Sequence, residues 1–317
     1  MKAAQVTNRN TSSARPVSDI ITGPYLSLEA LLRLRHRPFR QGASGRFQIS
    51  GSRAGQRLSS SKGRGIDFAE VRQYQPGDDV RTIDWRVTAR KNTPHTKLFR
   101  EEREHPALIL VDQNQHMFFG SIQRLKSVAA GELAARIAWQ VTAVGDRVGG
   151  MVVSNGREQL FKPVQTQKAV ARFLAAIATA NQNLNRLPPQ RGPASSASAL
   201  SKFRQLAGAR YRIFVISDFS GPISAWQDQL LPLAQDHLVR LLHIVDPLDA
   251  ELPPANQYAI SSAGRRHQFN SGDDSLRRRY RGVFEERVQA LKSLEGRLTY
   301  TSLSTADPHW DHHAWTS

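Results

Sequence analysis

The sequence predicts an α/β fold, in which a central, mostly parallel sheet is flanked by helices and preceded by an irregular basic N-terminal region. From residue 107 onward, short apolar runs alternate with segments of helical period, the pattern of a parallel sheet with crossover helices. Before it, the Gly- and Ser-rich run 42–65 shows neither helical nor strand period. We therefore expect four segments: a disordered N-terminus (1–26), a basic region (27–106), the α/β domain (107–303) and a C-terminal tail (304–317).

The individual elements follow from local patterns in chain order. Ser27 is an N-cap residue before the leucine-rich segment 28–34, which predicts a short helix. An Asn155-Gly156 pair predicts a hairpin that adds an antiparallel strand. Continuous apolar runs predict buried strands, the hairpin and the C-terminal segment add two further strands, and helices follow from apolar residues at helical spacing. The strands are 107–111, 148–153, 158–161, 211–216, 238–245 and 297–303, and the helices are 125–141, 167–179, 198–207 and 276–291.

The composition limits the possible classes of function. The 317 residues include 44 Lys and Arg against 27 Asp and Glu, a net charge of +17, and no cysteine. The missing cysteines exclude a disulfide framework, a thiol nucleophile and Cys-ligated metal sites, and they favour a reducing compartment. No run approaches the ~18 apolar residues of a membrane span, and residues 1–16 lack the apolar core of a secretory signal. We therefore expect a cytoplasmic protein without a transmembrane segment.

Two acids directly follow predicted strands, Asp112 after the first apolar run and Asp218 after the run 211–216. Because parallel sheets bind ligands beyond the carboxyl ends of their strands, we expect both carboxylates at one edge of the sheet. The order strand, acid, helix, hairpin strand, helices, strand and acid resembles the von Willebrand factor A fold. This resemblance implies a Mg²⁺ site that takes its ligands from Asp-x-Ser-x-Ser, a Thr and a later Asp.

The first motif departs from that pattern, since it reads Asp112-Gln113-Asn114-Gln115-His116. Asn114 offers an amide oxygen in place of a hydroxyl, while the nitrogen of His116 suits zinc, nickel or copper better than Mg²⁺. Ala194 stands where the Thr is expected, with Ser195 beside it. We therefore expect no resident cofactor, and the two acids then cap helices or pair with arginines. The alternative is a degenerate Mg²⁺ site that consists of Asp112, Asn114, His116 and Asp218.

Segment 63–90 alternates acids with arginines around two aromatic rings, Tyr74 and Trp85, and Pro76-Gly77 predicts a tight turn within it. Two interpretations stay open. In the first, the charges form a solvated surface, where each exposed ion pair contributes about 0.2–1 kcal/mol. In the second, carboxylates and guanidinium groups form bidentate pairs in a partly buried network that locks the loop, and breaking one pair costs about 3–5 kcal/mol.

The same segment resembles the signature of the domain of unknown function 58 (DUF58) family. That pattern runs Gly-x-Gly, Phe, Arg-x-Tyr, Pro-Gly-Asp-Asp, Arg, Ile-Asp-Trp and Ala-Arg, followed by a strand that ends in the Asp of a von Willebrand A-like domain. The resemblance spans roughly residues 28–303. The matching residues that we take as candidate site residues are Arg72, Tyr74, Gly77, Asp78, Asp79, Arg81, Asp84, Trp85 and Arg90.

This resemblance implies a partner-binding role. Members of the family typically accompany MoxR-type AAA+ ATPases and are thought to act with them as adaptors in the maturation or remodelling of client proteins. The resemblance implies no catalytic residue, and the sequence contains neither a P-loop nor a dinucleotide-binding glycine motif. We therefore expect a non-catalytic adaptor whose partners are a MoxR-type AAA+ ATPase and its client protein.

Two other classes of function have some support in the sequence. Segment 33–72 holds ten basic residues against Asp67 and Glu70, which suits the phosphates of a nucleic acid, with Phe47 or Trp85 for base stacking. The tail 309–313 gathers three imidazoles and one carboxylate, a set that also occurs in metal-dependent hydrolases. No known nucleic-acid-binding motif accompanies the basic segment, and no catalytic motif accompanies the tail. Nucleic-acid binding is therefore the alternative function, and a metallohydrolase is the weaker candidate.

Overall fold

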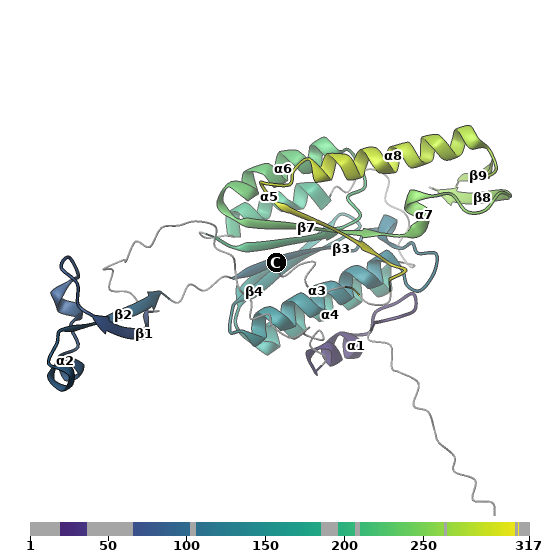
Figure 1. The fold of residues 1–317 in the computed structure, drawn as a ribbon. Helices are drawn as coiled ribbons and strands as arrows, with labels where there is room; N and C mark the ends of the chain where they lie inside the picture. The colour runs from purple at the N-terminus through teal and green to yellow at the C-terminus, as the bar shows by residue number, and fades with distance from the viewer. Residues whose placement is uncertain are drawn as a thin grey trace, which may run out of the picture. The chain divides into compact units, whose positions relative to one another are not determined.

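A six-stranded sheet forms the centre of the main unit (Figure 1). Our computed structural model describes residues 20–36, 66–101, 106–184, 196–206, 210–262, 265–307 and 310. Within this sheet β5 alone runs antiparallel to its neighbour, and every other pair is parallel. The predicted fold class, a mostly parallel α/β sheet with flanking helices, is therefore confirmed. In spatial order the strands are β10 (Thr299–Ser304), β7 (Leu238–Val245), β6 (Arg212–Ser217), β3 (Ala107–Asp112), β4 (Val148–Ser154) and β5 (Arg157–Val164).

The central strands are buried on both faces, as their continuous apolar runs predict. In β3, Ile109 and Val111 pack into one hydrophobic core, while Leu108 and Leu110 pack into the other. This alternation follows from the strand geometry, because successive side chains point to opposite faces of the sheet. The sheet therefore separates two cores, and each core needs its own layer of helices.

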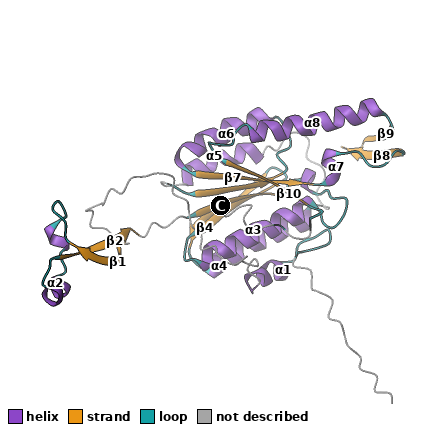
Figure 2. Cartoon of the chain, in the orientation of Figure 1, coloured by secondary structure: helices purple, strands orange, loops and turns teal. Residues whose placement is uncertain are grey.

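Helices cover both faces of the sheet (Figures 1 and 2). On one face lie α1 (Leu28–Arg33), α3 (Lys126–Ala143) and α4 (Gln167–Asn183). On the other lie α5 (Ser196–Leu206), α6 (Ile223–Asp236) and α8 (Asp274–Lys292). Short elements connect them: η1 (Leu34–His36), η3 (Gln115–Met117), α7 (Pro247–Ala250), and a hairpin of β8 (Gln257–Ser262) and β9 (Arg265–Asn270). No helix among the described residues is long and apolar enough to cross a membrane.

The first helix belongs to the α/β unit rather than to a separate basic region. Ser27 caps α1 by accepting a hydrogen bond from the backbone N–H of Ala30, as predicted. Leu31 and Leu34 then enter the core beside α3 and α4. The contacts therefore divide the chain differently from our segment 27–106, since the second unit lies within residues 45–105. Part of the expected C-terminal tail (304–317) also belongs to the α/β unit, because Thr305 and Trp310 are buried there.

The second unit is a small antiparallel hairpin with two short helical turns between its strands. Two contacts join these turns to the second strand. The backbone N–H of Asp84 donates to the His95 carbonyl, and Ile83 forms a β-bridge with Thr96. Among its residues with described exposure, His95 and Thr96 alone are buried. The elements are β1 (Ile66–Gln73), η2 (Val80–Thr82), α2 (Trp85–Lys91) and β2 (His95–Glu101).

In the α/β unit, helices α6 and α7 and strands β8 and β9 were not foreseen from the sequence, and in the second unit neither were β1, α2 and β2. Helix α6 contains Pro232, which removes a backbone donor and obscures the helical signal. Trp226, Leu230 and Leu233 nevertheless pack into the second core, so tertiary burial outweighs the local penalty. The hairpin has no Asn-Gly or Asp-Gly turn and a mostly polar sequence, which explains why no strand pattern stands out there.

A buried charge cluster ties separate chain segments to α3. The carboxylate of Glu132 accepts from Arg124 at 2.7 Å and from Arg136 at 2.8 Å, and the side chains of all three are at most 6% exposed. It also accepts from the backbone N–H of Ile21 at 2.8 Å. The Arg124 guanidinium lies 4.0 Å from the centre of the Trp310 ring, a cation–π contact. One carboxylate thus holds both ends of the described chain against α3.

We expect Glu132→Gln to lower the free energy of unfolding by about 3–5 kcal/mol, because it leaves two buried guanidinium groups without their counter-charge. Urea unfolding followed by circular dichroism measures this loss. The matched control is Glu29→Gln, which removes the partner of Arg33 in an exposed pair on α1 and is expected to change stability by less than about 0.5 kcal/mol. Equal losses in the two variants would contradict the structural role of the Glu132 cluster.

Candidate functional site

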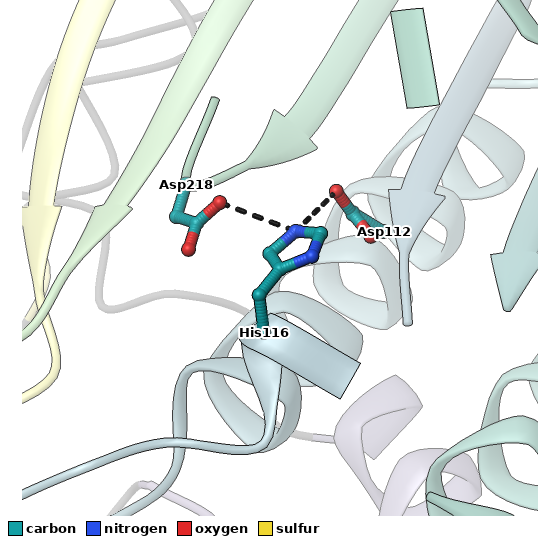
Figure 3. Close-up of side chains that lie close together, drawn as sticks. All are labelled: Asp112, His116 and Asp218. Carbon is teal, nitrogen blue, oxygen red and sulfur yellow. Dashed lines mark hydrogen bonds and ion pairs between the residues drawn. The ribbon is translucent and has the colours of Figure 1, made fainter. Parts of the chain in front are cut away.

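Three parallel strands end in acids at one edge of the sheet. Asp112 ends β3, Asp218 follows β6 and Asp246 follows β7. We call this the carboxyl edge. Asp112 and Asp218 are both buried, and they lie together as the parallel strand directions predict (Figure 3). Two negative charges in a buried position require compensating charge or hydrogen bonds, so the surrounding side chains decide what this edge can do.

His116 lies between the two carboxylates (Figure 3). Its Nε2 is 3.2 Å from Oδ2 of Asp112 and 3.3 Å from Oδ1 of Asp218. The single turn η3 carries it there, because Met117 enters the core and fixes the turn against the sheet. The imidazole side chain remains 37% exposed. His116 therefore bridges the acids from the solvent side of the edge.

Lys126 supplies a second cation from the first turn of α3. Its Nζ donates to Oδ2 of Asp218 at 2.7 Å and to Oδ1 of Asp249 at 3.1 Å, with only 4% of the side chain exposed. Lys126 was not among the residues predicted from the sequence, and it lies 92 positions from Asp218. One signal was available, because a lysine at the start of a helix opposes the helix dipole and is favoured there only beside an acid.

Hydroxyl and amide groups complete the surroundings of Asp112. Ser217 Oγ donates to its Oδ2 at 2.7 Å, and Asn114 donates to its Oδ1 through the backbone N–H and the side-chain amide. Asn114 thus turns its nitrogen toward Asp112, while its amide oxygen accepts from the backbone N–H of Asn155. In this orientation the amide oxygen of Asn114 does not face Asp112, and its role as a metal ligand stays a prediction.

The loop expected to supply a threonine substitute contributes a different residue. Ala194 and Ser195 lie outside the described residues, so the expectation that they stand in for the threonine ligand stays a prediction. The next residue, Ser196, begins α5 and accepts a hydrogen bond from Asn114 Nδ2 at 2.9 Å. The His-rich tail is outside the described residues except for Trp310, whose indole N–H donates to the Ser304 carbonyl. None of the histidines or the aspartate of that tail is therefore among the described residues.

The charges at the carboxyl edge shift one another's pKa values. Burial disfavours the ionised form of Asp218, but Lys126 and His116 outweigh it and hold the pKa of Asp218 well below its usual range. Burial likewise opposes ionisation of Asp112, and His116 lowers the pKa of Asp112 overall. For His116, burial is outweighed by the two carboxylates, which raise its pKa to about 9. These shifts favour an imidazolium between two carboxylates at neutral pH.

A magnesium ion, which the von Willebrand A-like fold implies at this place, does not fit these residues. Mg²⁺ prefers six oxygen ligands in octahedral geometry. Here every oxygen of Asp112 and Asp218 already accepts a hydrogen bond from a nearby donor, and two of those donors are cations. Asn114 presents its nitrogen, so it adds no oxygen ligand. Mg²⁺ would have to displace Lys126 and His116.

The acids of the signature segment mainly cap turns and helices. Asp78 closes the turn at Gly77, where it accepts from the Gln75 N–H and from Arg72 Nη2 at 2.7 Å. Gly77 has φ of +106°, a conformation that favours glycine. Asp79 caps η2, and Asp84 caps α2 by accepting from the N–H groups of its second and third residues. The second interpretation, a network of bidentate pairs around the rings, is thus largely replaced by local caps.

The arginines of this segment are consequently left on the surface. Within the described residues, Arg81, Arg86 and Arg90 form no ion pair, and all three are exposed. Trp85 is 71% exposed, although Tyr74 is half-buried and its N–H donates to the Pro94 carbonyl. Trp85 with these three arginines forms what we call the Trp85 surface. Of the two interpretations of the segment, the solvated charged surface describes it better.

A loop with exposed apolar side chains crosses the carboxyl edge between η3 and α3. The Ser121 N–H donates to Oδ2 of Asp246 at 2.8 Å, which fixes the loop at the end of β7. On either side of this anchor, Phe119 is 40% exposed and Ile122 is 64% exposed. The Lys126 ammonium lies 5.5 Å from the centre of the Phe119 ring. The carboxyl edge therefore presents an apolar surface, while its strongest charges are paired beneath.

Comparison with known proteins gives one family and several similar folds. A family model described as "Protein of unknown function DUF58" matches residues 70–289. The uncharacterized protein Rv1480 of Mycobacterium tuberculosis is 31% identical over 253 residues, which cover 78% of this chain and 77% of that protein.

Among solved structures, BatB from Bacteroides thetaiotaomicron is similar at 16% identity and a TM-score of 0.43, over 64% of this chain and 91% of that one. The SpRpn10 VWA domain is similar at 13% identity and a TM-score of 0.36, over 64% and 90% of the two chains. These structural likenesses concern the fold alone.

The raised pKa of His116 gives a test of its position. A group whose pKa rises on folding stabilises the native state fully below its unfolded pKa, here 6.5, and loses that contribution as the pH passes the folded value of about 9. Because more than a third of the side chain is exposed, solvent limits the effect to on the order of 1–2 kcal/mol. Urea unfolding between pH 6.5 and 9 is expected to show this loss in the wild type. His116→Gln should lack this component, and identical pH profiles would contradict the bridging role.

The capping role of Asp84 is tested by two substitutions at the same position. Asp84→Ala removes the acceptor for the first N–H groups of α2, so we expect several-fold faster amide hydrogen exchange at Arg86 and Val87. Asp84→Asn keeps a good N-cap and is expected to exchange nearly as the wild type does. If both substitutions accelerated exchange equally, the charge near Lys97 rather than the cap would hold the turn.

Proposed function

Because this chain belongs to the DUF58 family, we propose that it is a non-catalytic adaptor that works by protein–protein binding. The observation that carries the proposal is the carboxyl edge, where buried acids are paired with His116 and Lys126 beneath an exposed apolar loop. An exposed apolar surface at the end of a rigid sheet suits contact with another protein.

The partner that we propose is a MoxR-type AAA+ ATPase together with its client protein, as the family resemblance implies. The chain offers two surfaces for them. The loop with Phe119 and Ile122 is apolar, and the Trp85 surface combines an exposed ring with exposed arginines. Trp and Arg are enriched among residues that dominate protein–protein binding energy, which supports a contact role for the Trp85 surface. We place the complex in the cytoplasm.

A tagged pull-down from the source cells tests this proposal. The lysate is treated with nuclease and washed at about 0.3 M salt, where exposed charge attraction is largely screened. The proposal predicts that mass spectrometry identifies a retained AAA+ ATPase. If no ATPase is retained and the untreated eluate carries nucleic acid that salt removes, the adaptor role is wrong and the basic segment 33–72 becomes the functional surface.

We expect Ile122→Glu to reduce retention of the ATPase at least tenfold, because it places a charge in the centre of an apolar contact. The matched control is Leu238→Glu. Leu238 is 50% exposed, compared with 64% for Ile122, but it begins β7 at the opposite edge of the sheet. Quantitative mass spectrometry of the retained ATPase compares the two variants with the wild type. A loss in the Leu238 variant alone, or an equal loss in both, would contradict binding at the carboxyl edge.

A further inference from the structure

The buried acids at the carboxyl edge are balanced by side-chain cations of the same chain. Asp112 and Asp218 carry two negative charges, and His116 and Lys126 contact them at 2.7 to 3.3 Å. Both acids are buried, so their charges are shielded from water and require nearby positive charge. A single divalent cation between two carboxylates would provide the same total charge.

We propose that His116 and Lys126 form a built-in cation pair that takes the place of a divalent metal ion, so that the carboxyl edge folds and works without metal. Neither cation is a peripheral addition. Lys126 is fixed at the beginning of α3, and His116 is fixed by the turn η3, whose Met117 is buried in the core. The backbone between β3 and α3 therefore positions both cationic side chains beside Asp112 and Asp218.

The hydrogen bonds at the acids favour the cation pair over a metal ion. Asp218 accepts from Lys126 at one oxygen and from Ser220 at the other, at 2.7 Å in each case. Asp112 accepts from Ser217 and from the Asn114 amide. An incoming ion would have to break several of these bonds and expel a buried ammonium group. The remaining oxygens would not complete the six-ligand shell of Mg²⁺.

A transition metal held by His116 and the two carboxylates is the competing arrangement. Such an ion needs a neutral imidazole nitrogen as ligand, because a protonated nitrogen has no free lone pair. Lys126 would then add positive charge beside the ion instead of relieving negative charge. Metal-binding measurements with Mn²⁺, Mg²⁺ and Zn²⁺ separate the two arrangements.

The test is rescue by a metal ion of a chain that lacks one of its cations. We expect Lys126→Met to lower the Tm, since it leaves Asp218 and Asp249 without their ammonium partner. Millimolar Mn²⁺ should then restore the Tm by several degrees in a saturable manner, because the ion binds the native state alone. His116→Ser is the second variant and is expected to behave in the same way. The wild type should show no saturable response to Mn²⁺, Mg²⁺ or Zn²⁺.

Two controls make the outcome specific to the carboxyl edge. Glu132→Gln is destabilised at a different buried cluster, so Mn²⁺ should not rescue it. Adding Asp112→Asn to either cation variant should abolish the rescue and the binding of Mn²⁺ measured by electron paramagnetic resonance. A variant that folds only when Mn²⁺ is present during refolding would also support the proposal.

Two results would overturn the cation pair. The first is saturable binding of Mn²⁺, Mg²⁺ or Zn²⁺ by the wild type that Asp112→Asn removes. The second is the absence of Mn²⁺ binding in folded Lys126→Met and His116→Ser alike. These measurements use the isolated chain, so they are independent of whether the chain is an adaptor, which the pull-down decides separately.

Discussion

Compensation of the buried acids at the ends of β3 and β6 is the constraint on which the carboxyl edge depends. A parallel sheet places Asp112 and Asp218 side by side, and burial makes two unpaired carboxylates there prohibitively unfavourable. The turn η3 and the start of α3 meet this requirement, since η3 carries His116 and α3 carries Lys126. The loop between them is held over the edge as a result, with Ser121 bonded to Asp246.

Under the proposed adaptor role, the same constraint explains why the surface of this edge is suited to contact with a partner protein. Its charged groups are paired below the surface, and the loop above them exposes apolar side chains such as Ile122. In the second unit, too, the aspartates are satisfied by nearby groups. There Asp79 and Asp84 are used as caps, while Trp85, Arg81, Arg86 and Arg90 remain exposed. In both units, local satisfaction of acids determines which side chains are left for a partner.

Much of this arrangement could be predicted from the sequence, because strand burial and strand direction are local and periodic properties. The apolar runs of β3, β6 and β7 predict the parallel sheet, and its geometry brings Asp112 and Asp218 together. The partners of Lys126 and Ser196 are distant in sequence, so the position of Lys126 at the start of a helix was the only hint of its role, and Ser196 had none. The signature acids were ambiguous for another reason: an aspartate before a helix can cap it or pair with an arginine, and spacing alone does not distinguish the two.

The protonation state of His116 is the most direct test of this account, because a cation pair requires an imidazolium between the carboxylates. Nitrogen-15 NMR of the imidazole, assigned by comparison with His116→Gln, reports whether each ring nitrogen carries a proton. With no added metal at neutral pH, we expect both nitrogens of His116 to be protonated, with titration near pH 9. A neutral ring at neutral pH, or a ring nitrogen bound to a metal that copurifies with the chain, would contradict the account.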